Sequence, residues 1–154
     1  MKLARLAFVF AAFSTVAACA GSNAAMMSDQ EIADFGTKAY PAPKPKVFAA
    51  AVGALKAQGY QIATANEEKG TIVTARKIIR SVAVGNAYSA TAIDYTRQYF
   101  LQLNRAGGQT TVVARPSVYQ GEADLSAQKV WDLEGPVGER VLWNSLFKQI
   151  NELL

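Results

Sequence analysis

The stretch that decides the fold runs from Ala92 to Asn104 and reads AIDYTRQYFLQLN. Ile93, Tyr95, Tyr99, Leu101 and Leu103 share one parity, and Asp94, Thr96, Gln98, Gln102 and Asn104 share the other. Side chains alternate between the two faces of a strand, so this pattern predicts a β-strand with one buried face and one polar face.

Three further strands are predicted on either side of this one. They are YQIATA (60–65), TIVTARKIIRSVAV (71–84) and QTTVVARPSVY (109–119), separated by polar or glycine-rich turns. Pro116 cannot donate a ladder hydrogen bond, so the last strand should lie at an edge or end there. Residues 81–92 are small and uncharged, and they fit either an extended hairpin, with Gly85-Asn86 as a possible tight turn, or a mobile loop.

Two amphipathic helices are expected at the ends of this strand region. Residues 46–58 carry apolar side chains at helical spacing and are followed by Gly59, and residues 137–154 close the chain. We therefore predict an α+β fold of order α-β-β-β-β-α. Its architecture would be a two-layer sandwich, an antiparallel four-stranded meander with both helices on one face.

The N-terminus has the order of a secretory signal. Lys2 and Arg5 precede an apolar run from Leu6 to Phe13, and small residues lead into Cys19. The quartet VAAC at 16–19 resembles the lipobox of bacterial lipoproteins. That resemblance implies cleavage after residue 18, with a diacylglycerol on the Cys19 thiol and an acyl chain on its amine. No other cofactor is expected.

Two other interpretations of the signal remain open. Ala18-Cys19-Ala20 also fits ordinary signal cleavage, which would release a soluble periplasmic or secreted protein, and an uncleaved membrane anchor is conceivable. Under the lipoprotein resemblance, Ala20 in place of an aspartate implies the periplasmic face of the outer membrane. Residues 19–45 then form a Pro-rich tether, in which Ser28 to Glu31 could cap a short helix, and residues 46–154 form one α+β domain.

The composition argues against several classes of function. The chain has no histidine and one cysteine, which removes the commonest general base and the clustered zinc ligands, and no catalytic motif is present. We expect no enzyme and no metal site. Removal of residues 1–18 lowers Lys+Arg from 16 to 14 against 12 acids, leaving a formal charge of about +2, so nucleic acid is not an expected partner.

Arg97 is the most informative polar residue, because its parity places it in the apolar stripe of the 92–104 strand. A guanidinium there needs a partner, solvent or an anionic ligand. One hypothesis is that Tyr95, Arg97 and Tyr99 line a groove for a carboxylate or phosphate. The alternative is an outer sheet face on which Arg97 stacks on the tyrosines in solvent.

Arg76, Lys77 and Arg80 form the densest basic cluster. They could contact anionic lipid headgroups or a partner, or they could be the solvated side chains of an ordinary edge strand. The stretch APKPKVFAAAVGALKAQGY (42–60) and the closing helix resemble the small helix-grip domains of several outer-membrane lipoproteins, including those that accompany the β-barrel assembly machinery. We therefore expect a non-catalytic accessory or binding module with an envelope protein partner. The alternative is a carrier that binds a small amphiphilic or anionic ligand on the sheet face near Tyr95, Arg97 and Tyr99.

Overall fold

A computed structural model describes residues 28–154 except 87–88 and 125–137. The helices are α1 (Asp29–Asp34), α2 (Lys44–Ala57) and α3 (Glu139–Glu152). The strands are β1 (Thr37–Tyr40), β2 (Ile62–Asn66), β3 (Thr71–Thr74), β4 (Lys77–Asn86), β5 (Ser89–Ala106), β6 (Gln109–Gln120) and β7 (Ala123–Asp124). The predicted signal peptide and Cys19 lie outside the described residues.

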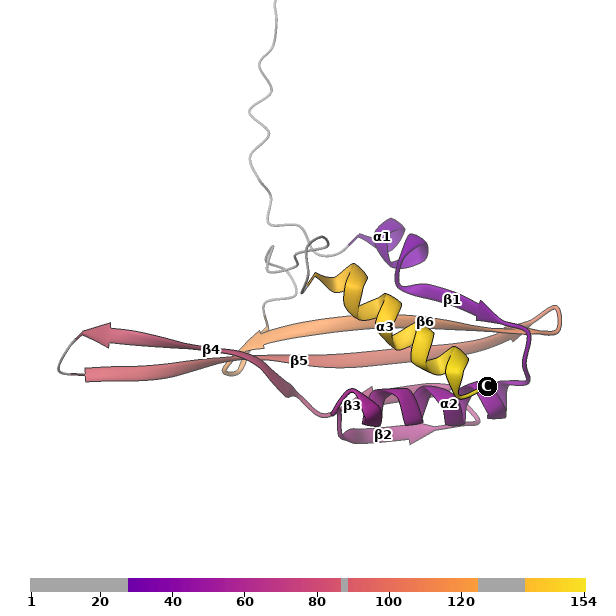
Figure 1. The fold of residues 1–154 in the computed structure, drawn as a ribbon, viewed down its shortest axis with the longest axis horizontal. Helices are drawn as coiled ribbons and strands as arrows, with labels where there is room; N and C mark the ends of the chain where they lie inside the picture. Colours follow the sequence, from indigo (N-terminus) through magenta and orange to yellow (C-terminus); the bar gives the residue numbers. More distant parts are fainter. Residues whose placement is uncertain (1–27, 87–88, 125–137) are drawn as a thin grey trace, which may run out of the picture.

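All strand pairs of the described sheet are antiparallel, in the order β1-β6-β5-β3-β2, with β4 also paired to β5 and β7 to β6 (Figure 1). The predicted α+β class with a mainly antiparallel sheet is confirmed. The expectation of four strands and two helices was wrong in number. The structure adds β1 and β7, and it divides the predicted 71–84 strand into β3 and β4. The short helix expected after Ser28 is present as α1, which brings the described helices to three.

The long strand β5 explains that division. Its second half pairs with β3, from Thr71↔Gln102 to Val73↔Phe100, and its first half pairs with β4, from Lys77↔Arg97 to Asn86↔Ser89. Pairing with β6 begins only at Tyr95. The β4–β5 hairpin therefore continues beyond the rest of the sheet as a two-stranded ribbon (Figure 1). The tight turn proposed at Gly85-Asn86 is instead part of β4, and the residues that join the strands lie outside the described ones.

The strand β6 is not the edge that Pro116 suggested, because β1 and β7 pair along its other side. The N–H of Ala114 donates to Gly36 O on the β1 side, so the backbone nitrogen of Pro116, two residues later, faces the same side. Neither β1, which pairs with residues 110–113, nor β7, which pairs with 119–120, reaches that position. Proline is thus accommodated in a gap between two short strands.

The domain begins earlier than the predicted boundary at residue 46. A capping box on Ser28 and Glu31 starts α1, as the sequence indicated, but Tyr40 of the supposed tether is 1% exposed. Its hydroxyl donates to Phe147 O at 3.0 Å. The helix α2 begins within the proline run, because Pro45 lies in the first turn, where a missing N–H breaks no helical bond. Residues 28–45 are therefore part of the folded domain, whereas 19–27 lie outside the described residues.

The core lies between one face of the sheet and the helices α2 and α3. Its buried members include Val47, Ala51 and Leu55 of α2, Tyr99, Leu101 and Leu103 of β5, Val112 and Ala114 of β6, and Trp143, Leu146 and Ile150 of α3. Trp143 is fully buried and donates its indole N–H to Ala114 O at 3.1 Å. The odd-numbered face of β5 is thus the buried one, as the alternation predicted.

Candidate functional site

Arg97 finds a partner inside its own chain. Its Nη2 atom lies 3.0 Å from Oε2 of Glu139, the first residue of α3, and the two side chains are 11% and 1% exposed. Neither Glu139 Oε2 nor Arg97 Nε makes a well-directed hydrogen bond, so the contact is mainly a charge pairing. The cation that the sequence placed in an apolar stripe is therefore neutralised by a buried carboxylate on a helix.

Two tyrosines complete this buried group. The Tyr99 hydroxyl donates to Glu139 Oε1 at 2.6 Å, and the ring of Tyr60 meets that of Tyr99 edge to face at 5.2 Å. The backbone N–H of Tyr99 donates to Thr74 Oγ1 at 2.9 Å. The group ties β5 to the start of α3 and to the segment that follows α2.

The pKa values within the group reflect burial first. Burial raises the pKa of the Glu139 carboxyl, although Arg97 and the Tyr99 hydroxyl act in the opposite direction. Burial, then the Glu139 charge, raises the pKa of Tyr99 well above its ordinary value. Burial alone would lower the pKa of Arg97, but Glu139 and the two tyrosines raise it, so the guanidinium stays charged.

These contacts correct the hypothesis of an anion-binding groove at Tyr95, Arg97 and Tyr99. Tyr99 is buried and Arg97 is paired with Glu139, so neither presents a free group to a ligand. Tyr95 is half-buried, and its ring centroid lies 6.0 Å from the guanidinium carbon of Arg80. The sequence analysis did not identify Glu139 as the partner of Arg97, because no sequence pattern links these two residues.

The basic residues Arg76, Lys77 and Arg80 do not form one cluster. Arg76 stacks on the Tyr119 ring at 3.8 Å and forms an ion pair with Glu122 at 3.1 Å. Lys77 donates to Gln58 O at 2.6 Å. Lys77 and Arg80 pair with odd-numbered residues of β5 and so share the helix side of the sheet, whereas Tyr119 pairs with Thr96 on the opposite face. The predicted common headgroup surface is therefore divided between two faces.

The β4–β5 ribbon is the most exposed element of the sheet. From Ser81 to Ile93 the sequence has no charged residue, and the side chains of that stretch that the structure describes are exposed or half-buried. Val84 is 52% exposed and, before the uncharged stretch, Ile78 is 57% exposed. Among the described strands, β4 has β5 as its one partner, and β5 has no second partner before Tyr95. The ribbon thus presents two open backbone edges.

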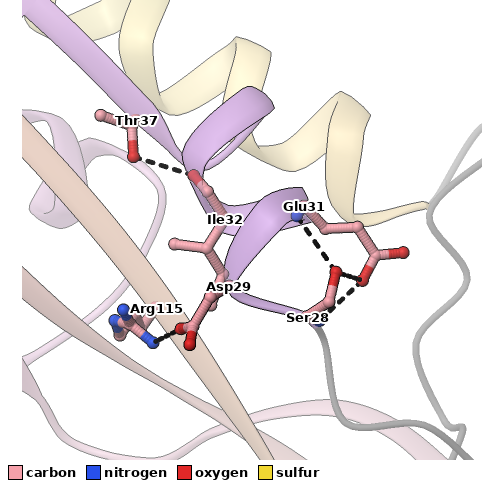
Figure 2. Close-up of polar contacts among 6 residues, drawn as sticks. All are labelled: Ser28, Asp29, Glu31, Ile32, Thr37 and Arg115. Carbon is pink, nitrogen blue, oxygen red and sulfur yellow. Dashed lines mark hydrogen bonds and ion pairs between the residues drawn. The ribbon is translucent and has the colours of Figure 1, made fainter.

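A cleft that the sequence did not predict lies between α1 and β1 on one wall and α3 on the other. Figure 2 shows what holds the first wall: the capping box of α1, a hydrogen bond from Thr37 Oγ1 to Ile32 O at 2.8 Å, and an ion pair between Arg115 and Asp29 at 3.2 Å. The cleft has a volume of about 500 Å³. Sequence reasoning missed it because β1 was assigned to a tether.

No group of three or more metal-ligating side chains was found among the described residues. In the same part of the chain, no helix is both long enough and apolar enough to span a membrane.

No protein-family model matches this chain, and no curated protein matches it in sequence. Among solved structures, the chain is similar to a DUF4468 family protein from Bacteroides ovatus ATCC 8483, at 12% identity and a TM-score of 0.37. The similarity covers 76% of this chain and 77% of that one.

Proposed function

We propose that this protein is a non-catalytic outer-membrane lipoprotein that faces the periplasm and binds an envelope protein through its β4–β5 ribbon. The exposed, uncharged ribbon is the observation that carries the proposal. Residues 1–18 act as the signal, and Cys19 carries a diacylglycerol and an acyl chain. The two-layer arrangement, with α2 and α3 on one face of the sheet, is part of this proposal and is supported by the shared core.

The ribbon is suited to pairing with a strand of another protein. Soluble proteins normally protect open sheet edges with lysines, prolines or covering loops. Between Ser81 and Ile93 this chain has neither lysine nor proline, and Val82, Val84 and Ile93 supply the β-branched side chains that favour strands. Addition of a partner strand would satisfy the open edge of β4 and cover these apolar side chains.

The buried charged group supports a binding role rather than a catalytic one. Tyr99 and Glu139 have side chains whose chemistry would serve an acid or a base, and in the core Glu139 is held by both Tyr99 and Arg97. Their contacts fix α3 on the sheet, so their role is structural. The rigid core then supports a projecting ribbon.

Photo-crosslinking in intact cells tests the proposal. A photoreactive amino acid at Val84, compared with one at the exposed Glu67 in the β2–β3 turn, should give a discrete adduct with an envelope protein at position 84 alone. Ala83→Lys places a charge on the ribbon and should abolish the adduct, whereas Thr64→Lys, on the exposed strand β2, should leave it unchanged. Equal adducts at both positions, or an adduct insensitive to Ala83→Lys, would reject the ribbon as the contact surface.

A further inference from the structure

The cleft between β1 and α3 goes beyond the proposed function, because it is a second surface, separate from the ribbon. Its lining residues from α1 and β1 are Asp34, Phe35, Thr37 and Lys38, and those from α3 are Asn144, Phe147, Lys148 and Asn151. Residues 144, 147, 148 and 151 are spaced so that they share one face of a helix. One wall is thus a short strand at the edge of the sheet, and the other is a helix face.

The backbone of β1 is open toward the side away from β6. The hydrogen bond from Ala114 N–H to Gly36 O makes Gly36 and Ala114 a hydrogen-bonded pair, and such pairs alternate along an antiparallel ladder. The backbone groups of Lys38 and Tyr40 therefore face β6, whereas those of Thr37 and Ala39 face outward. Among the described strands, β1 pairs with β6 alone. The outward groups can accept and donate hydrogen bonds to an added strand.

The charged side chains that line the cleft indicate which side chains the added strand should carry. Lys38 is the cross-strand partner of the buried Val112, so its side chain lies on the helix side of the sheet, and it forms no ion pair with a described carboxylate. Within the described ranges, the ion pair of Lys148 is an exposed one with Glu152 at 3.7 Å. The one acid of the lining, Asp34, already accepts a hydrogen bond from Gln30 at 2.8 Å. Two lysines on opposite walls therefore favour a carboxylate between them.

The remaining lining fits an extended peptide chain. Phe35 and Phe147 offer apolar contact, and the amide side chains of Asn144 and Asn151 on α3 can both donate and accept hydrogen bonds. A groove between an edge strand and a helix supports strand addition, in which the main chain supplies affinity and alternate side chains supply specificity.

We propose that this cleft binds an extended acidic segment of a partner protein, which adds as a strand to the outer edge of β1. The residue opposite Lys38 carries a carboxylate that pairs with Lys38 and Lys148. Its alternate residues face away from the helix, beside Thr37 and Ala39.

The test uses the purified full chain and a fluorescein-labelled peptide of alternating valine and glutamate, with a valine–lysine peptide for comparison. The acidic peptide should bind and the basic one should not. Lys38→Glu and Lys148→Glu should each weaken binding about fivefold, because each reverses a partly exposed ion pair. Lys69→Glu, an equal charge change in the β2–β3 turn, should leave the affinity unchanged. The double variant Lys38→Glu/Lys148→Glu should bind the basic peptide instead.

A separate variant tests the proposed backbone hydrogen bonds between the peptide and the outer edge of β1. Ala39→Pro removes an outward N–H without removing a bond to β6, and it should weaken the acidic peptide about tenfold. Binding that is insensitive to Ala39→Pro and to both lysine reversals would overturn the proposal, as would equal binding of the two peptides. Loss of the Val84 adduct would not bear on this result, and loss of peptide binding would leave the ribbon proposal intact.

Discussion

At the scale of single residues, the Arg97–Glu139 pair determines how α3 attaches to the sheet. Replacing Arg97 with methionine leaves the 1% exposed Glu139 without its cation. We expect Arg97→Met to lower the free energy of unfolding by about 3 kcal/mol, because a buried charge without its partner is costly. The double variant Arg97→Met/Glu139→Gln should lose less than the sum of the two single variants, as measured by urea unfolding. Strict additivity would mean that the two residues do not interact.

The same carboxyl predicts how stability depends on pH. Burial holds the pKa of Glu139 above its ordinary value of 4.5 in the folded protein, so between these two values the folded state binds more protons than the unfolded state. The stabilisation is complete below about pH 4.5 and is lost as the pH rises through the folded pKa. The free energy of unfolding should therefore fall across this interval, and Glu139→Gln should remove that fall. An equal fall in both proteins would assign it to another group.

At the scale of elements, substitution of two glycines by alanine should have opposite effects on stability, because the space around the added Cβ differs. A Cβ at Gly36, between α1 and β1, would lie 2.8 Å from the Trp143 ring and 3.0 Å from Ala114 O. We expect Gly36→Ala to cost about 2 kcal/mol, because neither the buried ring nor the backbone can move away. Gly53→Ala in α2 meets only the end of the exposed Leu153 side chain at 3.0 Å and should stabilise the helix by about 0.5 to 1 kcal/mol. The free energies of unfolding of both variants can be measured by chemical denaturation, and equal changes in the two would contradict this prediction.

The elements also show what a sequence can predict. Periodicity identified the buried face of β5 and both long helices, because burial on one face repeats along the chain. It missed β1, since four residues such as Thr37 to Tyr40 are too few to show alternation, and a strand at that position is held by its partner β6. At Arg97 the sequence showed that a partner was required. It could not show that the partner was Glu139, because this contact depends on how α3 crosses the sheet.

At the scale of the whole molecule, the two proposed binding surfaces and the predicted anchor lie in different parts of the chain. The ribbon extends from the sheet beyond the region that α2 and α3 cover (Figure 1), and the cleft lies between α1, β1 and α3. The described domain begins at Ser28, so if Cys19 carries the lipids, eight residues separate it from the domain. Fully extended, they span about 30 Å with the bonds at their ends. Such a short spacer would keep the domain close to the membrane surface, where an envelope protein could reach both the ribbon and the cleft.

The proposed lipid anchor would make Cys19 the residue that determines where the protein acts. In the membrane fraction, the intact mass should show loss of residues 1–18 and the addition of a diacylglycerol and an acyl chain. Two or three chains, at roughly 0.8 kcal/mol per buried CH₂, hold a protein stably on a bilayer, so the wild-type chain should sediment with membranes. Cys19→Ala should lack the added mass and should also lose the Val84 adduct with an outer-membrane partner. A chain that begins at Gly21 without lipid would contradict the anchor and identify a soluble periplasmic or secreted protein. The contacts of the ribbon and the cleft would then have to form without confinement to a membrane.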